Sequence, residues 1–381
     1  MQERQLNFGV LINQEWADAL ESQKGVFDAV MYALAAGHCG VRLYFFRCRD
    51  VNLRRGALRG WVPQSSVEPI TWAYQEVPCP DVYYDQIKLP HLDHTRLVST
   101  VRRRLAATSI SLNPVRALPK WKTHVVLSRF PDVAGLLPET QLCRSPRSIA
   151  AMLRRHRAVL AKPDRGSWGQ GISRITRAGR GRYALQLSAE DKRWRSISAA
   201  GAYAICTLYA GGDRVLLQQQ IPLMETSAGE VSDMRVVTSK NRQGEWEVTQ
   251  NFLRMAAPGR FTTNWHQGAR NETLAEGLPL LGITEREVPQ VVADLHLTAL
   301  RVAARLEQGF GRLAEIGIDL ALDRGGRMWL IEANASPDKG TDSSDRWEPV
   351  PHIFLNIVEC AQHLAEQHAP AAQGSRPGRL T

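Results

Sequence analysis

Residues 315–334 decide the fold, and they read Glu-Ile-Gly-Ile-Asp-Leu-Ala-Leu-Asp-Arg-Gly-Gly-Arg-Met-Trp-Leu-Ile-Glu-Ala-Asn. Side chains along a β-strand point alternately to its two faces. The apolar residues at every second position from Ile316 to Leu322 therefore predict a strand with one buried face. Within the turn Asp323–Arg327, the pair Gly325-Gly326 suits the two-residue loop of a β-hairpin. We predict two antiparallel strands joined at these glycines.

Three oxygen-bearing side chains meet on one face of this predicted hairpin. With the glycines at the tip, Arg324 pairs with Arg327, and Asp319 stands directly opposite Glu332. Asn334 points to the same face as Glu332 because side chains alternate. Two facing carboxylates and an amide, without nitrogen or sulfur ligands, suit Mg²⁺ carried by nucleotide phosphates. The alternative is an edge hairpin with a solvated polar face, and the apolar residues that flank both acids count against it.

A glycine-rich loop lies upstream, between two strand-like runs. It reads Lys162-Pro-Asp-Arg-Gly166-Ser167-Trp-Gly169-Gln-Gly171. Backbone N–H groups freed by glycine can close over phosphate oxygens, and the lysine supplies a point charge. P-loop and dinucleotide-binding sites need a helix after the glycines, and protein kinases place their lysine after the loop, so both are excluded. Alone, such a loop is as often structural as functional. Beside the predicted hairpin it indicates a phosphate-binding flap.

Composition is that of a soluble globular protein. The 381 residues suit two or three domains, with 44% hydrophobic and 23% charged residues. We see no run near the roughly 20 apolar residues of a membrane span, and no signal-peptide pattern at Met1–Gln5. Six cysteines without a C-x-x-C pair argue against a zinc site or a disulfide framework. We expect a cytoplasmic protein with no membrane partner.

The formal net charge of +10 raises the question of a nucleic-acid partner. Two short basic runs occur, Arg102–Arg104 and Arg154–Arg157, and both lie in amphipathic helical patterns where a solvated basic face is the simpler explanation. Neither run carries a recognised nucleic-acid-binding module or interleaved aromatic residues. The sequence therefore argues against a nucleic-acid partner.

Three further segments of the chain have a clear sequence pattern. Strand-like and helical segments alternate over residues 1–118, which predicts an α/β unit with a mainly parallel sheet. Residues 288–306 carry apolar side chains at the spacing of one helical face. The tail, 368–381, is rich in Pro, Gly, Ala and Arg and is predicted to be disordered.

Several motifs, taken in order, resemble the ATP-grasp superfamily, and more closely its spore-coat-associated YheC/YheD type. The motifs are Leu137-Pro-Glu-Thr140, Lys162–Ile172, Leu217-Gln-Gln-Gln-Ile221, Asp233-Met-Arg235, Trp246, Arg254, Thr263-Asn264 and Gly317–Asn334. The resemblance implies an α/β domain, residues 1–118, followed by an α+β ATP-grasp fold with two subdomains that clamp ATP. Residues 119–215 would carry the glycine flap, and residues 216–367 the metal hairpin.

The resemblance also implies roles at the nucleotide. Lys162 and one of Lys120 or Lys122 would reach the α- and β-phosphates, and the flap, including Gly166, Ser167, Gly169 and Gly171, would cover them. A hinge strand would meet adenine through backbone groups, and an acid would bind the ribose; these residues are Gln218, Gln219, Ile221 and Asp233. The hinge lacks the glutamate of many ATP-grasp enzymes, which leaves adenine selectivity open.

Near the γ-phosphate of ATP, the resemblance implies two metal ions. Asp319 and Glu332 would ligate one Mg²⁺, and Glu332 would bridge to a second held by Asn334. Arg235 and Arg254 would face the γ-phosphate and the acceptor. Asn264 and Gly268 would lie on the acceptor side, although Gly268-Ala269 stands where two glycines are expected.

The implied function is an ATP- and Mg²⁺-dependent ligase that joins a carboxylate to an amine through an acyl phosphate. Its substrates would be an amino acid, a peptide or another small molecule, and a homodimer is left open. The alternative is a structural or regulatory protein of the same fold that binds ATP without turnover.

Overall fold

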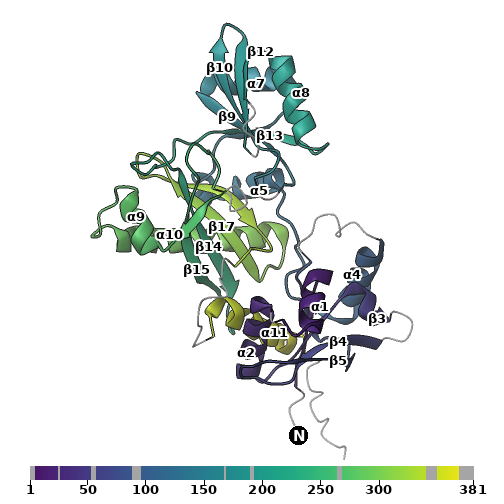
Figure 1. The fold of residues 1–381 in the computed structure, drawn as a ribbon. Helices are drawn as coiled ribbons and strands as arrows, with labels where there is room; N and C mark the ends of the chain where they lie inside the picture. The colour runs from purple at the N-terminus through teal and green to yellow at the C-terminus, as the bar shows by residue number, and fades with distance from the viewer. Residues whose placement is uncertain are drawn as a thin grey trace, which may run out of the picture. The chain divides into compact units, whose positions relative to one another are not determined.

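The computed structural model of the chain describes residues 5–24, 26–52, 57–87, 96–166, 169–188, 193–263, 268–339 and 350–368. Three predictions fall outside these ranges: the flap residue Ser167, the substrate residue Asn264, and the tail beyond His368. The chain forms two compact units (Figure 1). One comprises residues 1–114, 240–245 and 340–381, and the other comprises residues 115–239 and 246–339.

The first unit is built on a seven-stranded sheet with strand order β3-β4-β2-β1-β6-β7, in which β5 pairs with β4. Strands β2, β1, β6 and β7 are parallel, whereas β3, β4 and β5 pair antiparallel at one side. The sheet is therefore mixed, and the prediction of a mainly parallel sheet holds for only four strands. The strands are β1 Asn7–Leu11, β2 Arg42–Phe46, β3 Val51–Asn52, β4 Ala57–Pro63, β5 Trp72–Val77, β6 Val82–Asp85 and β7 Ile110–Ser111.

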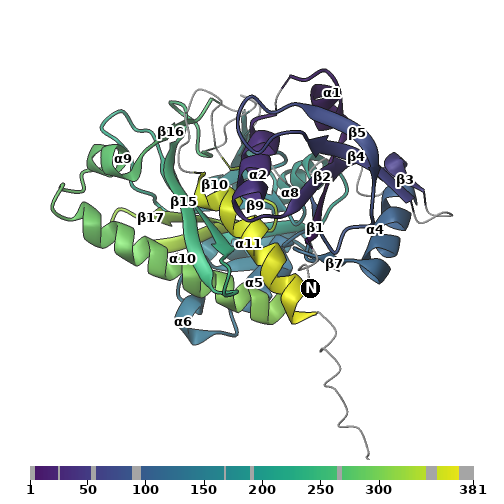
Figure 2. The ribbon, with the colours of Figure 1, turned by 90° about the horizontal axis from the view of Figure 1, so that it is seen from below.

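The helices of the first unit come from both ends of the chain. They are α1 Gln14–Glu21, α2 Phe27–His38, α4 Arg96–Thr108 and α11 His352–Gln367, with a short 3₁₀ turn, η1 Cys48–Asp50. Helix α11 packs against α2, as Figure 2 shows, and its Phe354 ring lies 5.1 Å from that of Tyr32 and 6.3 Å from that of Phe27, centroid to centroid. The last helix thus completes the core of the unit that the chain begins.

The second unit contains two sheets, and the first has six strands in the order β12-β11-β10-β9-β13-β8. The strands are β8 Thr140–Leu142, β9 Ala158–Pro163, β10 Ser173–Gly179, β11 Arg182–Leu187, β12 Arg193–Ile197 and β13 Val215–Gln219. Helices α7 Pro146–Arg155 and α8 Ala199–Tyr209 pack with alternate strand residues such as Val159, Ala161 and Leu217 in one core. The intervening residues, including Lys162 and Gln218, therefore point to the other face.

The second sheet has five strands in the order β16-β15-β14-β17-β18. They are β14 Ser232–Lys240, β15 Trp246–Met255, β16 Arg270–Glu272, β17 Glu315–Leu322 and β18 Met328–Asn334. Helices α9 Leu274–Leu280 and α10 Val288–Phe310 share its core, and Figure 2 shows α10 lying along this sheet. The buried α10 residues Leu295, Ala299, Val302 and Leu306 confirm the predicted helical face. Short helices α5 Lys120–Leu127 and α6 Pro131–Ala134 precede both sheets in the chain.

The hairpin β17–β18 confirms the pairing of Asp319 with Glu332. The predicted two-residue loop is wrong. The turn spans Asp323 to Arg327, and the Asp323 side chain accepts hydrogen bonds from the backbone N–H groups of Gly325 and Arg327, at 2.9 and 3.0 Å. This wider turn shifts the register by one residue, and a β-bulge between Asp319 and Leu320 shifts it back.

The fold class agrees with the prediction: an α/β unit, and a second unit with two helix-covered sheets. No helix among the described residues is both long enough and apolar enough to cross a membrane.

Candidate functional site

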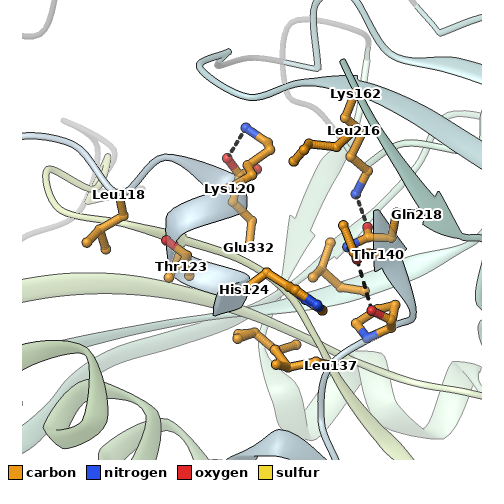
Figure 3. A pocket seen from close by; sticks show the side chains of 14 residues that line it. Leu118, Lys120, Thr123, His124, Leu137, Thr140, Lys162, Leu216, Gln218 and Glu332 are labelled. Carbon is orange, nitrogen blue, oxygen red and sulfur yellow. Dashed lines mark hydrogen bonds and ion pairs between the residues drawn. The ribbon is translucent and has the colours of Figure 1, made fainter. Parts of the chain in front are cut away.

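A pocket opens in the second unit, between residues of the two sheets (Figure 3). Its walls come from α5, from the segment before β8, from β9 and β13 of the six-stranded sheet, and from β18 of the five-stranded sheet. The lining residues are Leu118, Lys120, Thr123, His124, Leu137, Pro138, Thr140, Lys162, Leu216, Gln218 and 330–333. Apolar walls with a few polar groups are typical of a small-molecule site.

Of the two lysines left open by the sequence, Lys120 lies at this pocket. Its ammonium group pairs with Glu332 Oε1 at 2.8 Å and donates a hydrogen bond to the Gly166 carbonyl oxygen, also at 2.8 Å. Lys122 does not join it, since its Nζ atom lies 4.5 Å from the ring centroid of Phe310. Lys120 therefore connects the glycine flap to the predicted metal hairpin.

Lys162 is buried on β9 and has an amide as its hydrogen-bond partner. Its Nζ atom donates to Gln218 Oε1 at 2.6 Å. Burial lowers the pKa of Lys162 to about 8. The charge of Glu332 is the largest opposing effect, Lys120 adds a smaller lowering effect, and two aspartates oppose it weakly. A buried ammonium without a carboxylate partner attracts an anionic ligand.

Two arginines and two aspartates form a second cluster on the five-stranded sheet. Arg254 donates from Nε and Nη2 to the two carboxylate oxygens of Asp233, both at 2.7 Å, and its Nη2 lies 2.8 Å from Asp319 Oδ2. Arg235 pairs with Asp319 from the neighbouring strand. Thr263 adds a hydrogen bond to Asp233 at 2.6 Å. The charges of this cluster balance.

The same contacts set the ionisation of the two acids. Burial alone would raise the pKa of Asp319, but the charges and hydrogen bonds of Arg235 and Arg254 outweigh it and lower the pKa to about 2. Burial raises the pKa of Asp233, and the negative charge of Asp319 acts in the same direction, although Arg254 opposes both. Asp319 therefore stays ionised over the whole physiological range.

The hairpin brings together the oxygen groups that the sequence predicts as metal ligands. Asp319 and Glu332 are directly opposed across the two strands. Asn334, two residues further along β18, pairs with Gly317. The described residues contain no group of three or more His, Cys, Asp or Glu side chains that could hold a metal ion. Two carboxylates and an amide fill only part of an octahedral Mg²⁺ shell, so phosphate and water oxygens would complete it.

Part of the reason for glycine at the described positions of the flap is structural. Gly169 and Gly171 have φ values of +67° and +72°, where other residues are strained. A Cβ atom on Gly166 would lie 2.8 Å from Pro163 Cγ. Ser188, the residue after β11, holds Gly169, because its hydroxyl donates to the Gly169 carbonyl oxygen at 2.7 Å. Gly169 is thus held by a hydrogen bond, and at all three described glycines a side chain would be strained or would clash.

The remaining predicted residues lie outside the pocket lining: Gln219, Ile221, Gly268 and Asn334. The backbone N–H of Gln219 is already bonded to the Glu139 carbonyl oxygen at 2.8 Å. Gly268 precedes β16 with a φ of +85°.

Sequence reasoning missed three polar residues of the pocket. Thr140 stood in a quoted motif without a role, and no motif marked Thr123 or His124. The Thr123 hydroxyl is buried without a hydrogen-bond partner. Burial lowers the pKa of His124, whose ring stacks on Trp121 with centroids 5.7 Å apart.

Comparison with known proteins places this geometry in context. A family model described as YheC/D like ATP-grasp matches residues 110–364, more than half of the chain. Two proteins of Bacillus subtilis (strain 168) are similar. "Endospore coat-associated protein YheD" is 29% identical over 343 residues, 88% of this chain and 73% of that protein. "Endospore coat-associated protein YheC" is 22% identical over 308 residues, 81% of this chain and 84% of that protein.

Two solved structures share the fold. D-cycloserine synthetase DcsG superposes with a TM-score of 0.52 at 13% identity, covering 94% of this chain and 99% of that one. D-alanyl-alanine synthetase A from Vibrio cholerae O1 biovar eltor gives a TM-score of 0.53 at 12% identity, covering 96% and 100%. At these identities the likeness concerns the fold alone.

Proposed function

This chain belongs to the YheC/D-like ATP-grasp family, and from that premise we propose that it is an ATP- and Mg²⁺-dependent ligase joining a carboxylate to an amine. The observation that carries the proposal is the pocket, where two lysines from different elements meet the acidic hairpin. Lys162 brings an unbalanced positive charge, and Lys120 lies between the flap and Glu332. This is an arrangement for a polyphosphate and its metal ions.

Each charged group has a distinct task in this proposal. Lys120 and Lys162 hold the phosphates, and the glycine flap covers them. Asp319, Glu332 and Asn334 would hold Mg²⁺, which would neutralise the charge that develops on the transferred phosphoryl group. The carboxylate substrate attacks the γ-phosphorus, ADP leaves, and the amine displaces phosphate from the acyl phosphate.

The arginines stabilise the transferring group. Arg254 and Arg235 each give Nε and Nη2 to aspartates, and the Nη1 group of each has no hydrogen-bond partner among the described residues. The aspartates hold both guanidinium groups in place before the substrate arrives. Such preorganised donors contribute most where charge develops in the transition state.

A second candidate is a structural or regulatory protein that binds Mg²⁺·ATP without turnover. It is favoured by the similar Bacillus subtilis proteins, whose names state coat association and no reaction. We also propose, as finer points, that the substrates are an amino acid, a peptide or another small molecule, and that the protein acts in the cytoplasm.

The test is to titrate Mg²⁺·ATP and to measure ADP formation with pools of carboxylic acids and amines. A ligase forms ADP only when both substrates are present, and Glu332→Gln abolishes this activity. Tight Mg²⁺·ATP binding with no ADP from any pair would favour the second candidate. No binding of Mg²⁺·ATP would refute both candidate functions.

A further inference from the structure

Thr123 brings a buried hydroxyl group to the pocket (Figure 3). The residue lies near the start of α5, three positions after Lys120, and only 7% of its surface is exposed. Its Oγ1 atom is shielded from solvent and has no hydrogen-bond partner in the described part of the chain. Burying a hydroxyl group without a partner costs free energy, and a partner that arrives with a ligand would recover this cost.

The hydroxyl group does not use the partner that a helix offers. A threonine within a helix can donate to the backbone carbonyl oxygen four residues earlier. Thr100 on α4 and Thr207 on α8 do so, at 2.7 and 2.9 Å. For Thr123 that oxygen belongs to Pro119, and it accepts the backbone N–H of Thr123 at 2.8 Å but not the hydroxyl hydrogen. The hydroxyl hydrogen of Thr123 therefore stays available to a ligand.

The charges around Thr123 favour an anionic ligand. Residues three apart on a helix lie on the same side, which places Thr123 next to Lys120. Lys120 and Lys162 both line the pocket, and the one carboxylate among the lining residues that the structure describes is Glu332. Burial lowers the pKa of His124, so its ring is neutral at pH 7. Two ammonium groups against one carboxylate leave the pocket with a net positive charge.

We propose that the Thr123 hydroxyl group donates a hydrogen bond to a phosphate oxygen of the bound nucleotide. The inference rests on the proposed use of ATP and adds an uncharged donor to the two lysines. A threonine hydroxyl has one hydrogen to give, and an ionised oxygen is a stronger acceptor than a neutral one. In the free protein the same hydroxyl lowers stability. Thr123 therefore affects folding and binding with opposite signs.

The experiment compares the wild-type chain with Thr123→Val, which removes the hydroxyl and keeps the shape of the side chain. ADP affinity should fall about 10- to 100-fold, the range for a hydrogen bond to a charged group. In urea denaturation without nucleotide, the midpoint of the second unit should rise, because a buried polar group without a partner is gone. Thr123→Ser keeps the hydroxyl and should restore most of the ADP affinity. A merely structural role would lower stability and affinity together.

A ligand series identifies the group that Thr123 contacts. Thr123→Val should weaken ADP and AMP but leave the affinity for adenosine unchanged. An equal loss for adenosine would place the contact at the base or the sugar and would overturn the inference. Thr238→Val is the matched control, since Thr238 is fully buried, does not line the pocket and donates to the Ile316 carbonyl oxygen at 3.3 Å. This variant should lower stability and leave ADP affinity unchanged.

These measurements need no acceptor substrate. A loss of ADP affinity with a gain in stability in Thr123→Val would support the inference even if no pair of substrates yields ADP, which would refute the ligase. Ligation by the wild type with unchanged ADP affinity in Thr123→Val would overturn the inference and leave the ligase in place. No ADP binding by the wild type would overturn the inference together with the proposed use of ATP.

Discussion

Replacing the buried lysine Lys162 with methionine should stabilise the nucleotide-free protein at pH 7. The pKa of Lys162 falls from its ordinary value of 10.5 to about 8 because the ammonium group is buried. This drop corresponds to about 3 kcal/mol of unfavourable free energy for keeping the group charged in the folded state at pH 7. Methionine fills a similar volume, and loss of the hydrogen bond to Gln218 costs about 1 kcal/mol. The net gain is about 2 kcal/mol.

The sign of the effect changes with pH. Between pH 8 and pH 10.5 the unfolded lysine holds a proton that the folded one has lost, so wild-type stability rises with pH in this window. The advantage of Lys162→Met should therefore shrink above pH 8 and become a loss of about 1 kcal/mol above pH 10.5, where the hydrogen bond alone remains.

The measurement is urea denaturation of the full chain at several pH values from 7 to 10.5. Hydrogen exchange of β9 and β13 amides would identify the transition of the second unit. Lys122→Met is the control. Lys122 makes a cation–π contact with Phe310, so loss of this contact should bring no gain in stability. A Lys162→Met variant that is less stable at pH 7, or whose advantage is independent of pH, would refute the reasoning.

Further predictions concern ligand binding and turnover. ATP affinity of the wild type should fall as pH rises above 8, because phosphate binding requires the protonated Lys162; a flat profile from pH 7 to 10 in calorimetric titration would contradict this. Glu332→Gln should remove the Mg²⁺ dependence of ATP binding while leaving the fold intact, as judged by Mg²⁺ titration and circular dichroism. Arg254→Lys keeps one charge but loses the two-point contact with Asp233, and it should lower turnover about 100- to 1000-fold with little change in ATP affinity. Equal losses in turnover rate and ATP affinity would indicate that Arg254 acts on the bound ground state. Asp323→Ala should destabilise the hairpin by about 1–2 kcal/mol in denaturation experiments, because two backbone N–H groups lose their acceptor, and an unchanged stability would speak against the turn.

Alternation of side chains predicted which residues share a face, and placing Gly325-Gly326 at the hairpin tip paired Asp319 with Glu332. The turn itself is different, because the Asp323 carboxylate accepts hydrogen bonds from backbone N–H groups and makes a wider loop than two glycines alone. The bulge that restores the register has no local signature. A correct pair was thus reached through a loop that was wrong in detail.

The choice between Lys120 and Lys122 depended on where a helix begins. Successive helical residues turn by about 100°, so residues two apart point in nearly opposite directions. With α5 starting at Lys120, one lysine faces Glu332 and the other faces Phe310. The side-chain role of Gln218 was equally hidden, since its partner Thr140 lies 78 residues away and is brought near only by the pairing of β8 with β13.

The place of α11 bears on how the chain folds during synthesis. The first unit begins with β1, yet its aromatic core around Tyr32 stays open until Phe354 has been made. All residues of the second unit's sheets are synthesised before Phe354, so the second unit can form its sheets without α11. A chain truncated before residue 350 would then hold a folded second unit and an incomplete first one. The order in which the two units mature would run opposite to the order in which their first strands are translated.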